Sequence, residues 1–135
     1  MRTGAVLIAA MLAACSGGSS APEVRNDNVP SVPGTATVYV FNTGTPAFKI
    51  GHNTVFDFQQ ELVKVSESRY AIVLIYGGRH AFSCAGMQNV APVVFDAVPG
   101  QTYYFQTYRG SQAQQICSFL PPATGQQLLA RMQNR

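Results

Sequence analysis

The fold class is decided by the stretch YAIVLIYGGRHAFSC, residues 70–84. Residues 70–76 are an uncharged run of β-branched, aromatic and other apolar residues, which is typical of a buried strand. Because the run is apolar on both alternating faces, we expect a central strand that is covered on each side. Gly77 and Gly78 then turn the chain into a second strand at residues 79–84. Short strands separated by glycine turns are typical of an antiparallel all-β protein.

Further short strands bounded by turn residues follow on both sides of this stretch. They are predicted at residues 35–41, 48–50, 54–56, 62–65, 93–96, 101–108 and 115–119. Gly51-His52-Asn53 is predicted as a tight hairpin, because Gly and Asn tolerate positive φ. Pro99-Gly100 suits the central positions of a type II turn and predicts a second hairpin. The pattern predicts an all-β, mainly antiparallel β-sandwich of about seven or eight short strands.

The last residues of the chain predict a short C-terminal α-helix. Thr124 and Gln127 have the spacing of a capping box. Leu128 and Met132 form an apolar pair four residues apart, which lies on one face of a helix. We expect this helix to pack against the sheet, so that residues 35–135 form one β-sandwich domain with a C-terminal helix.

The amino terminus has the pattern of an export signal. Arg2 supplies a positive start, and residues 4–11 form an apolar run that is shorter than the ~20 residues of a membrane-spanning helix. Leu12-Ala13-Ala14-Cys15 resembles the lipobox of bacterial lipoproteins. This resemblance implies a signal peptide at residues 1–14 and lipidation of Cys15. An ordinary signal peptide, with Cys15 as an incidental passenger, is the alternative.

Residues 15–34 are predicted to be the lipidated Cys and a flexible linker, because the segment is rich in Ser, Gly, Pro and Asn. By resemblance to lipoproteins of two-membrane bacteria, Ser16 after Cys15 implies transfer to the outer membrane, facing the periplasm. The expected location is therefore the bacterial cell envelope. The expected contact with the membrane is the lipid anchor.

The charge composition argues against a nucleic-acid partner. The 135 residues are 47% hydrophobic and 11% charged, with a formal net charge of +3. This charged share is well under the roughly 25% of ordinary soluble domains. The Lys and Arg residues are scattered, whereas nucleic-acid binding needs a concentrated basic stripe. We therefore expect no nucleic acid among the partners.

Several elements occur in an order that resembles a known family. They are Tyr39, a glycine turn at Gly51, Tyr70 leading to Gly78-Arg79-His80-Ala81-Phe82, and Pro99-Gly100-Gln101-Thr102-Tyr103-Tyr104-Phe105. The run is similar to the lipoprotein-associated domain of unknown function twenty-eight forty-six, over roughly residues 35–132. The resemblance implies a β-sandwich in the cell envelope without a characterised activity. The chain departs from the family pattern at Gly77-Gly78, where Pro-Gly is common, and in its two domain cysteines.

The two cysteines of the domain predict a disulfide. With Cys15 taken by lipid, Cys84 and Cys117 form an even pair in an oxidising compartment. A reactive thiol or a metal site is the alternative reading. A metal needs about four ligands at coordinating spacing, and the chain has neither Cys-x2-Cys nor His-x3-His. We expect no metal and no cofactor.

Catalytic residue patterns are weak, so we expect a protein that is not an enzyme. Four residues of extended strand separate His80 from Cys84 by about 13 Å, too far for a nucleophile and its base. The six carboxylates are dispersed, and the Gly-Gly pair leads into a strand rather than a phosphate-binding helix. The alternative is a small periplasmic hydrolase or redox protein, with a site around His80 that draws on Asp57 and Ser83.

A binding surface is predicted at Tyr104, Tyr108 and His80. Tyr104 and Tyr108 lie on one face of their strand, where outward rings could stack on a glycan or contact a protein. The same rings could instead cover a neighbouring sheet or the C-terminal helix. The sequence therefore favours a non-catalytic binding or structural module that presents a sheet face or edge to an envelope protein or cell-wall glycan.

Overall fold

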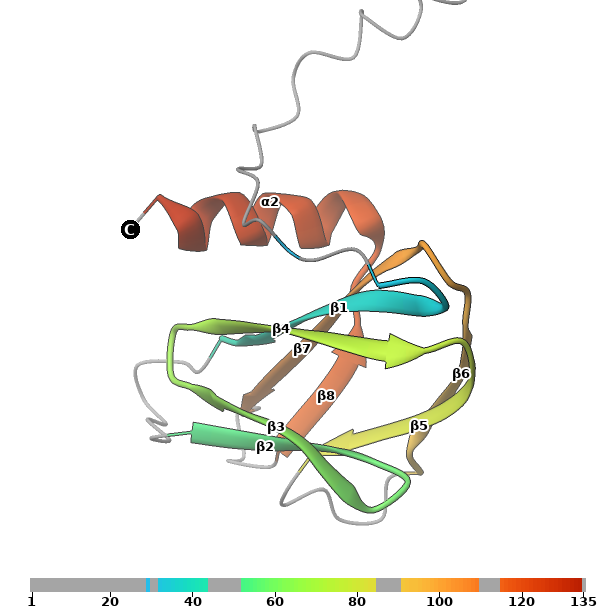
Figure 1. The fold of residues 1–135 in the computed structure, drawn as a ribbon. Helices are drawn as coiled ribbons and strands as arrows, with labels where there is room; N and C mark the ends of the chain where they lie inside the picture. Colours follow the sequence, from blue (N-terminus) through green and yellow to red (C-terminus); the bar gives the residue numbers. More distant parts are fainter. Residues whose placement is uncertain (1–28, 30–31, 44–51, 85–90, 110–114, 135) are drawn as a thin grey trace, which may run out of the picture.

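The computed structural model describes residues 29, 32–43, 52–84, 91–109 and 115–134, which form eight strands and one helix (Figure 1). The elements are β1 (Thr35–Asn42), β2 (His52–Asp57), β3 (Gln60–Ser66), β4 (Tyr70–Tyr76), β5 (Gly78–Cys84), β6 (Val93–Ala97), β7 (Thr102–Arg109), β8 (Gln115–Phe119) and α2 (Pro122–Gln133). The signal peptide, Cys15, most of the linker and the strand predicted at residues 48–50 lie outside the described residues.

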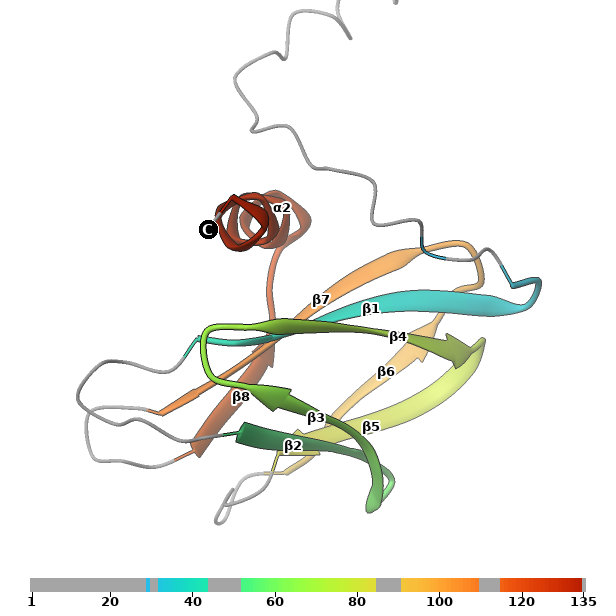
Figure 2. The same cartoon turned by 60° about the vertical axis from the view of Figure 1, so that its left-hand side comes forward.

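The strands form two four-stranded sheets. Sheet A has the order β4-β1-β7-β8, and sheet B has the order β3-β2-β5-β6. β1 and β7 are parallel, and the other described strand pairs are antiparallel. Figure 2 shows three layers, with sheet B below sheet A and α2 above it. The predicted all-β, mainly antiparallel sandwich with a C-terminal helix is confirmed.

The main hydrophobic core lies between the two sheets. Ala36, Val38 and Val40 of β1 point into it, because successive side chains of a strand alternate between its faces. Phe82 of β5 meets Phe105 of β7 edge to face, with 5.3 Å between the ring centroids. Interlocked rings of this kind, one from each sheet, hold the sandwich together.

A disulfide joins the sheets covalently. Cys84 ends β5 in sheet B, and Cys117 lies in β8 in sheet A. Both residues are buried. The bond closes a loop with a sequence separation of 33 residues, for which chain entropy predicts about 3–4 kcal/mol of stabilisation. The predicted disulfide is confirmed.

A second core lies on the other face of sheet A, under α2. Phe41, Tyr104 and Leu129 are its buried members. The helix begins at Pro122, so the capping box predicted at Thr124 is wrong and Thr124 lies inside the first turn. Proline is favoured in the first turn because its fixed φ suits a helix and its missing N–H needs no partner there.

β4 was expected to be a central strand, and this prediction is wrong. It is an edge strand of sheet A and, among the described strands, pairs only with β1. The central position is taken by β1, which pairs with β4 on one side and with β7 on the other. The apolar residues on the outer face of β4, such as Ile72 and Leu74, are half-buried rather than covered by a full layer.

The type II turn predicted at Pro99-Gly100 is present, but the hairpin is not. The Gln101 N–H donates to the Val98 carbonyl at 3.0 Å, and Gly100 has a φ of +85°. β6 before the turn belongs to sheet B, whereas β7 after it belongs to sheet A. Two-residue hairpins favour type I′ or II′ turns, since types I and II splay the flanking strands. The turn therefore leads the chain from one sheet to the other.

The hairpin predicted at Gly51-His52-Asn53 is also wrong. His52 and Asn53 open β2, and Asn53 pairs with Val65 of β3. The observed hairpin joins β2 to β3 through Phe58 and Gln59, whose φ angles are 48° and 72°. Positive φ at both loop residues is the requirement of a type I′ turn, normally met by Asn-Gly. Nothing in the residue types of this loop signals that conformation.

Candidate functional site

The His80 cluster joins the start of β5 to the end of β2. The Nδ1 atom of His80 lies 2.6 Å from Asp57 Oδ2, and its Nε2 atom lies 2.7 Å from the carbonyl oxygen of Tyr76. The second carboxylate oxygen of Asp57 accepts the Ala81 N–H at 3.1 Å. Both partners of the ring are acceptors, so the geometry is satisfied when both ring nitrogens carry a proton. This geometry favours the imidazolium form of His80.

The pKa of His80 follows from this environment. Burial alone would lower it, because a charged ring loses hydration. The hydrogen bonds to the Tyr76 carbonyl and the Asp57 carboxylate, together with the charge of Asp57, outweigh burial and raise the pKa of His80 above 6.5.

In this arrangement His80 is better suited to a structural role than to the role of a catalytic base. A general base needs a ring nitrogen that is free to accept a proton, whereas both His80 nitrogens are engaged with acceptors. Ser83 lies an odd number of residues from His80 on β5, which directs its side chain to the opposite face. Cys84 is locked in the disulfide. Of the residues expected around a hydrolase or redox site, Asp57 is therefore brought together with His80, whereas the Ser83 side chain is not.

The predicted tyrosine surface is covered in part. Tyr104 is only 7% exposed, so its assignment to an outward binding surface is wrong. It stacks on Tyr39 with 5.5 Å between the ring centroids, and Gly125 of α2 packs against its ring. Burial raises its pKa, although a hydrogen bond with Gln126 opposes the shift. Tyr108, at the far end of β7, is half-buried and has interaction partners of its own.

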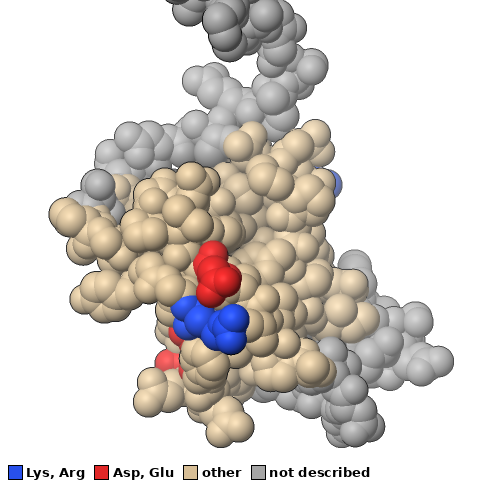
Figure 3. All heavy atoms as spheres, turned by 90° about the vertical axis from the view of Figure 1, so that its right-hand side faces the viewer, with Lys and Arg blue, Asp and Glu red and all other residues tan. Residues whose placement is uncertain are grey.

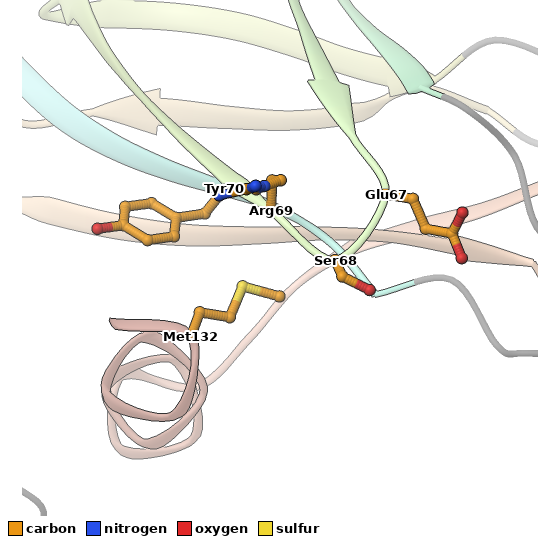
Figure 4. A pocket seen from close by; sticks show the side chains of 5 residues that line it. All are labelled: Glu67, Ser68, Arg69, Tyr70 and Met132. Atoms are coloured by element: carbon orange, nitrogen blue, oxygen red, sulfur yellow. The ribbon is translucent and has the colours of Figure 1, made fainter. Parts of the chain in front are cut away.

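Two hollows open on the described surface. One, of about 480 Å³, is lined by Glu67, Ser68, Arg69, Tyr70 and Met132. Figure 4 shows Met132 reaching from α2 toward the start of β4 and the residues just before it, while Glu67 points away. The other, of about 380 Å³, is largely apolar and lies between β6, β7, β8 and the start of α2. In the described part of the chain no three His, Cys, Asp or Glu residues are grouped to hold a metal.

The β4 edge is the surface that sequence reasoning missed. We use this name for the backbone of Ile72 and Leu74. The Gly77 N–H donates to the Gly34 carbonyl and the Asn42 N–H donates to the Arg69 carbonyl, which fixes the hydrogen-bond phase between β1 and β4. The N–H and C=O groups of alternate residues therefore point away from β1. No described strand pairs with β4 on that side.

The other three edges of the described sheets carry features that hinder pairing with a further strand, and β4 lacks these features. β3 carries Glu61 and Lys64, and the register between β2 and β3 shifts at Val55. β6 carries Asp96 and follows a proline, and β8 has five residues and holds the disulfide. β4 has seven residues without a charge, proline or glycine. Charges, prolines, bulges and short length are the usual protection of a sheet edge.

No family model, curated protein or solved structure matches the chain. The resemblance to the lipoprotein-associated family therefore stays a prediction. Within the residues described here, no helix is both long enough and apolar enough to cross a membrane.

Proposed function

We propose that the chain is a lipid-anchored lipoprotein of the bacterial envelope. In this proposal the domain faces the periplasm from the outer membrane and acts as a non-catalytic binding module. The lipobox-like Leu12-Ala13-Ala14-Cys15 supports the anchor. The Cys84–Cys117 disulfide agrees with an oxidising compartment. In this proposal β4 is the binding element, and the partner is an extended segment of an envelope protein.

The observation that carries the proposal is that no described strand pairs with the β4 edge. N–H and C=O groups that point outward from an edge at strand spacing are complementary to another strand, and adding such a strand is a common mode of peptide recognition. The side chains of Ile72 and Leu74 stand next to the position of an added strand, where they would contact its alternate residues. The absence of charge on β4 favours an apolar segment of the partner.

A protein partner is better supported than a glycan. Tyr104, a residue predicted to stack on a sugar, offers no accessible ring face, because it lies under α2 with Tyr39 stacked against it. The β4 edge offers chiefly main-chain groups, and these match a polypeptide strand.

The test is site-specific photocrosslinking in intact cells, with the photoreactive amino acid placed at Leu74. Lys64, an exposed residue on the edge strand of sheet B, is the matched control position. We expect a discrete protein adduct from Leu74 and none from Lys64. Equal capture at both positions, or capture at Lys64 alone, would show that the β4 edge is not the binding element.

The anchor is tested separately by labelling with a radioactive fatty acid. We expect incorporation into the native chain and its loss in Cys15→Ala. Incorporation that persists in the variant would contradict the lipoprotein assignment, whatever β4 binds.

A further inference from the structure

Three exposed apolar side chains lie at one end of the sandwich. They are Val32, 42% exposed, Tyr76, 75% exposed, and Val98, 51% exposed. Val32 precedes β1, Tyr76 ends β4, and Val98 leads into the turn before β7. We call this surface the apolar pole. Figure 1 shows these segments converging at the right-hand end of the molecule.

Backbone hydrogen bonds hold the three segments together. The Gly77 N–H donates to the Gly34 carbonyl at 2.9 Å, and the Gly100 N–H donates to the Thr35 carbonyl at 2.9 Å. Val32 is fixed in turn, because its carbonyl accepts hydrogen bonds from both the N–H and the hydroxyl of Thr35. The apolar pole is therefore a preformed surface and not a set of independent loops.

The same side of the molecule carries little charge. Arg79 and Asp96 approach each other to 3.9 Å, so that their opposite charges offset one another. Figure 3 views this side and shows an acidic and a basic group in contact, surrounded by a mostly uncharged surface. An apolar surface that carries no net charge meets no electrostatic barrier at a neutral lipid layer, and Tyr is favoured at the membrane interface.

The short segment between Cys15 and Val32 points to what the apolar pole contacts. Residues 16–31 are all that separate Cys15 from Val32, and the ends of a flexible linker of that length lie about 20–24 Å apart on average. We propose that the apolar pole rests on the surface of the lipid bilayer that holds the anchor. This inference depends on the lipid anchor of the proposed function and not on what β4 binds.

Tethering makes a weak surface contact effective. A short flexible linker holds its module at an effective concentration on the order of mM. A contact with a dissociation constant of that size is then roughly half occupied. β4 ends at the pole with Tyr76, so docking would place Leu74 and then Ile72 progressively farther from the lipid.

The experiment uses the chain from Cys15 to Arg135 with its disulfide intact. Its Cys15 thiol is coupled to a maleimide lipid in phosphatidylcholine vesicles, which supplies the anchor without cellular acylation. The sequence contains no Trp, so Tyr76→Trp introduces a single fluorescent reporter at the pole. Val94→Trp is the matched control, because Val94 is 58% exposed on the outer face of sheet B.

On coupling, we expect Tyr76→Trp emission to move to shorter wavelength and brominated lipid to quench it. Val94→Trp should keep its solution spectrum. Adding Val32→Ser and Val98→Ser to Tyr76→Trp should reduce the quenching. Equal spectra for both reporters, or quenching that the serine changes leave intact, would overturn the membrane contact. Neither result depends on acylation in cells, which the fatty-acid labelling tests by itself.

Discussion

His80 and Asp57, 23 residues apart in sequence, form the shortest side-chain contact between β5 and β2 described here, with 2.6 Å between Nδ1 and Oδ2. The contact positions the end of β2 before its turn, and the other ring nitrogen binds the Tyr76 carbonyl at the end of β4. One imidazole ring thereby contacts three strands that belong to both sheets.

The stability of the domain should fall as His80 loses its proton. Its pKa is raised above 6.5 in the folded state, so its contribution is complete below the unfolded value and is lost as pH rises through the folded value. We expect the urea midpoint to decrease from pH 6 toward pH 9. His80→Gln should flatten this part of the profile, whereas His52→Gln, at the exposed start of β2, should leave it unchanged. A profile that His80→Gln does not alter would contradict the charged-ring assignment.

The close approach of α2 to sheet A predicts an unusual effect of Gly125→Ala. In most helices this change stabilises by about 1 kcal/mol. Here the new methyl group would overlap the ring of Tyr104, and overpacking costs about 1–3 kcal/mol. We expect net destabilisation by chemical denaturation. Thr124→Ala, on an exposed neighbouring position, is the control and should be neutral or stabilising.

The turn between β2 and β3 should be improvable. Phe58 and Gln59 both adopt positive φ, which costs roughly 1–2 kcal/mol for each side-chain-bearing residue. Replacing the pair by Asn-Gly should raise the free energy of unfolding by about 1 kcal/mol. Reversing the order to Gly-Asn keeps the composition and serves as a comparison. Destabilisation by Asn-Gly would show that the exposed Phe58 ring contributes packing that outweighs backbone strain.

Removing the bond between the sheets should lower stability more than any of these changes. Cys84→Ser with Cys117→Ser should reduce the free energy of unfolding by about 3–4 kcal/mol. Reduction of the native chain should produce a similar loss, and the double variant should be insensitive to reductant. If reductant destabilised the double variant as well, the effect could not be assigned to this bond.

Local patterns predict the strands and the helix well, because alternation and turn chemistry are properties of neighbouring residues. Strand pairing, in contrast, depends on residues that are far apart in sequence. The type II turn at Pro99-Gly100 can be predicted from its residues, but the separation of β6 and β7 into different sheets cannot. Likewise, Tyr104 reads as inward or outward until α2 is placed over it. The His80–Asp57 pair and the β4 edge depend on which strands are neighbours, and the residue types alone do not specify that arrangement.

The β4 edge leads to a variant that separates binding from folding. Ile72 directs its N–H away from β1, so Ile72→Pro removes a donor that no described strand of the domain uses. Proline is tolerated at such edge positions, whereas it breaks a ladder hydrogen bond elsewhere. Val73→Pro, one residue along, removes an N–H that faces β1 and should be strongly destabilising.

We therefore expect Ile72→Pro to retain most of the native stability while abolishing the adduct captured from Leu74. The urea midpoint and the crosslinking yield, measured on the same variants, report stability and partner binding separately. A stable Ile72→Pro domain with an undiminished adduct would mean that the partner does not pair with the β4 backbone.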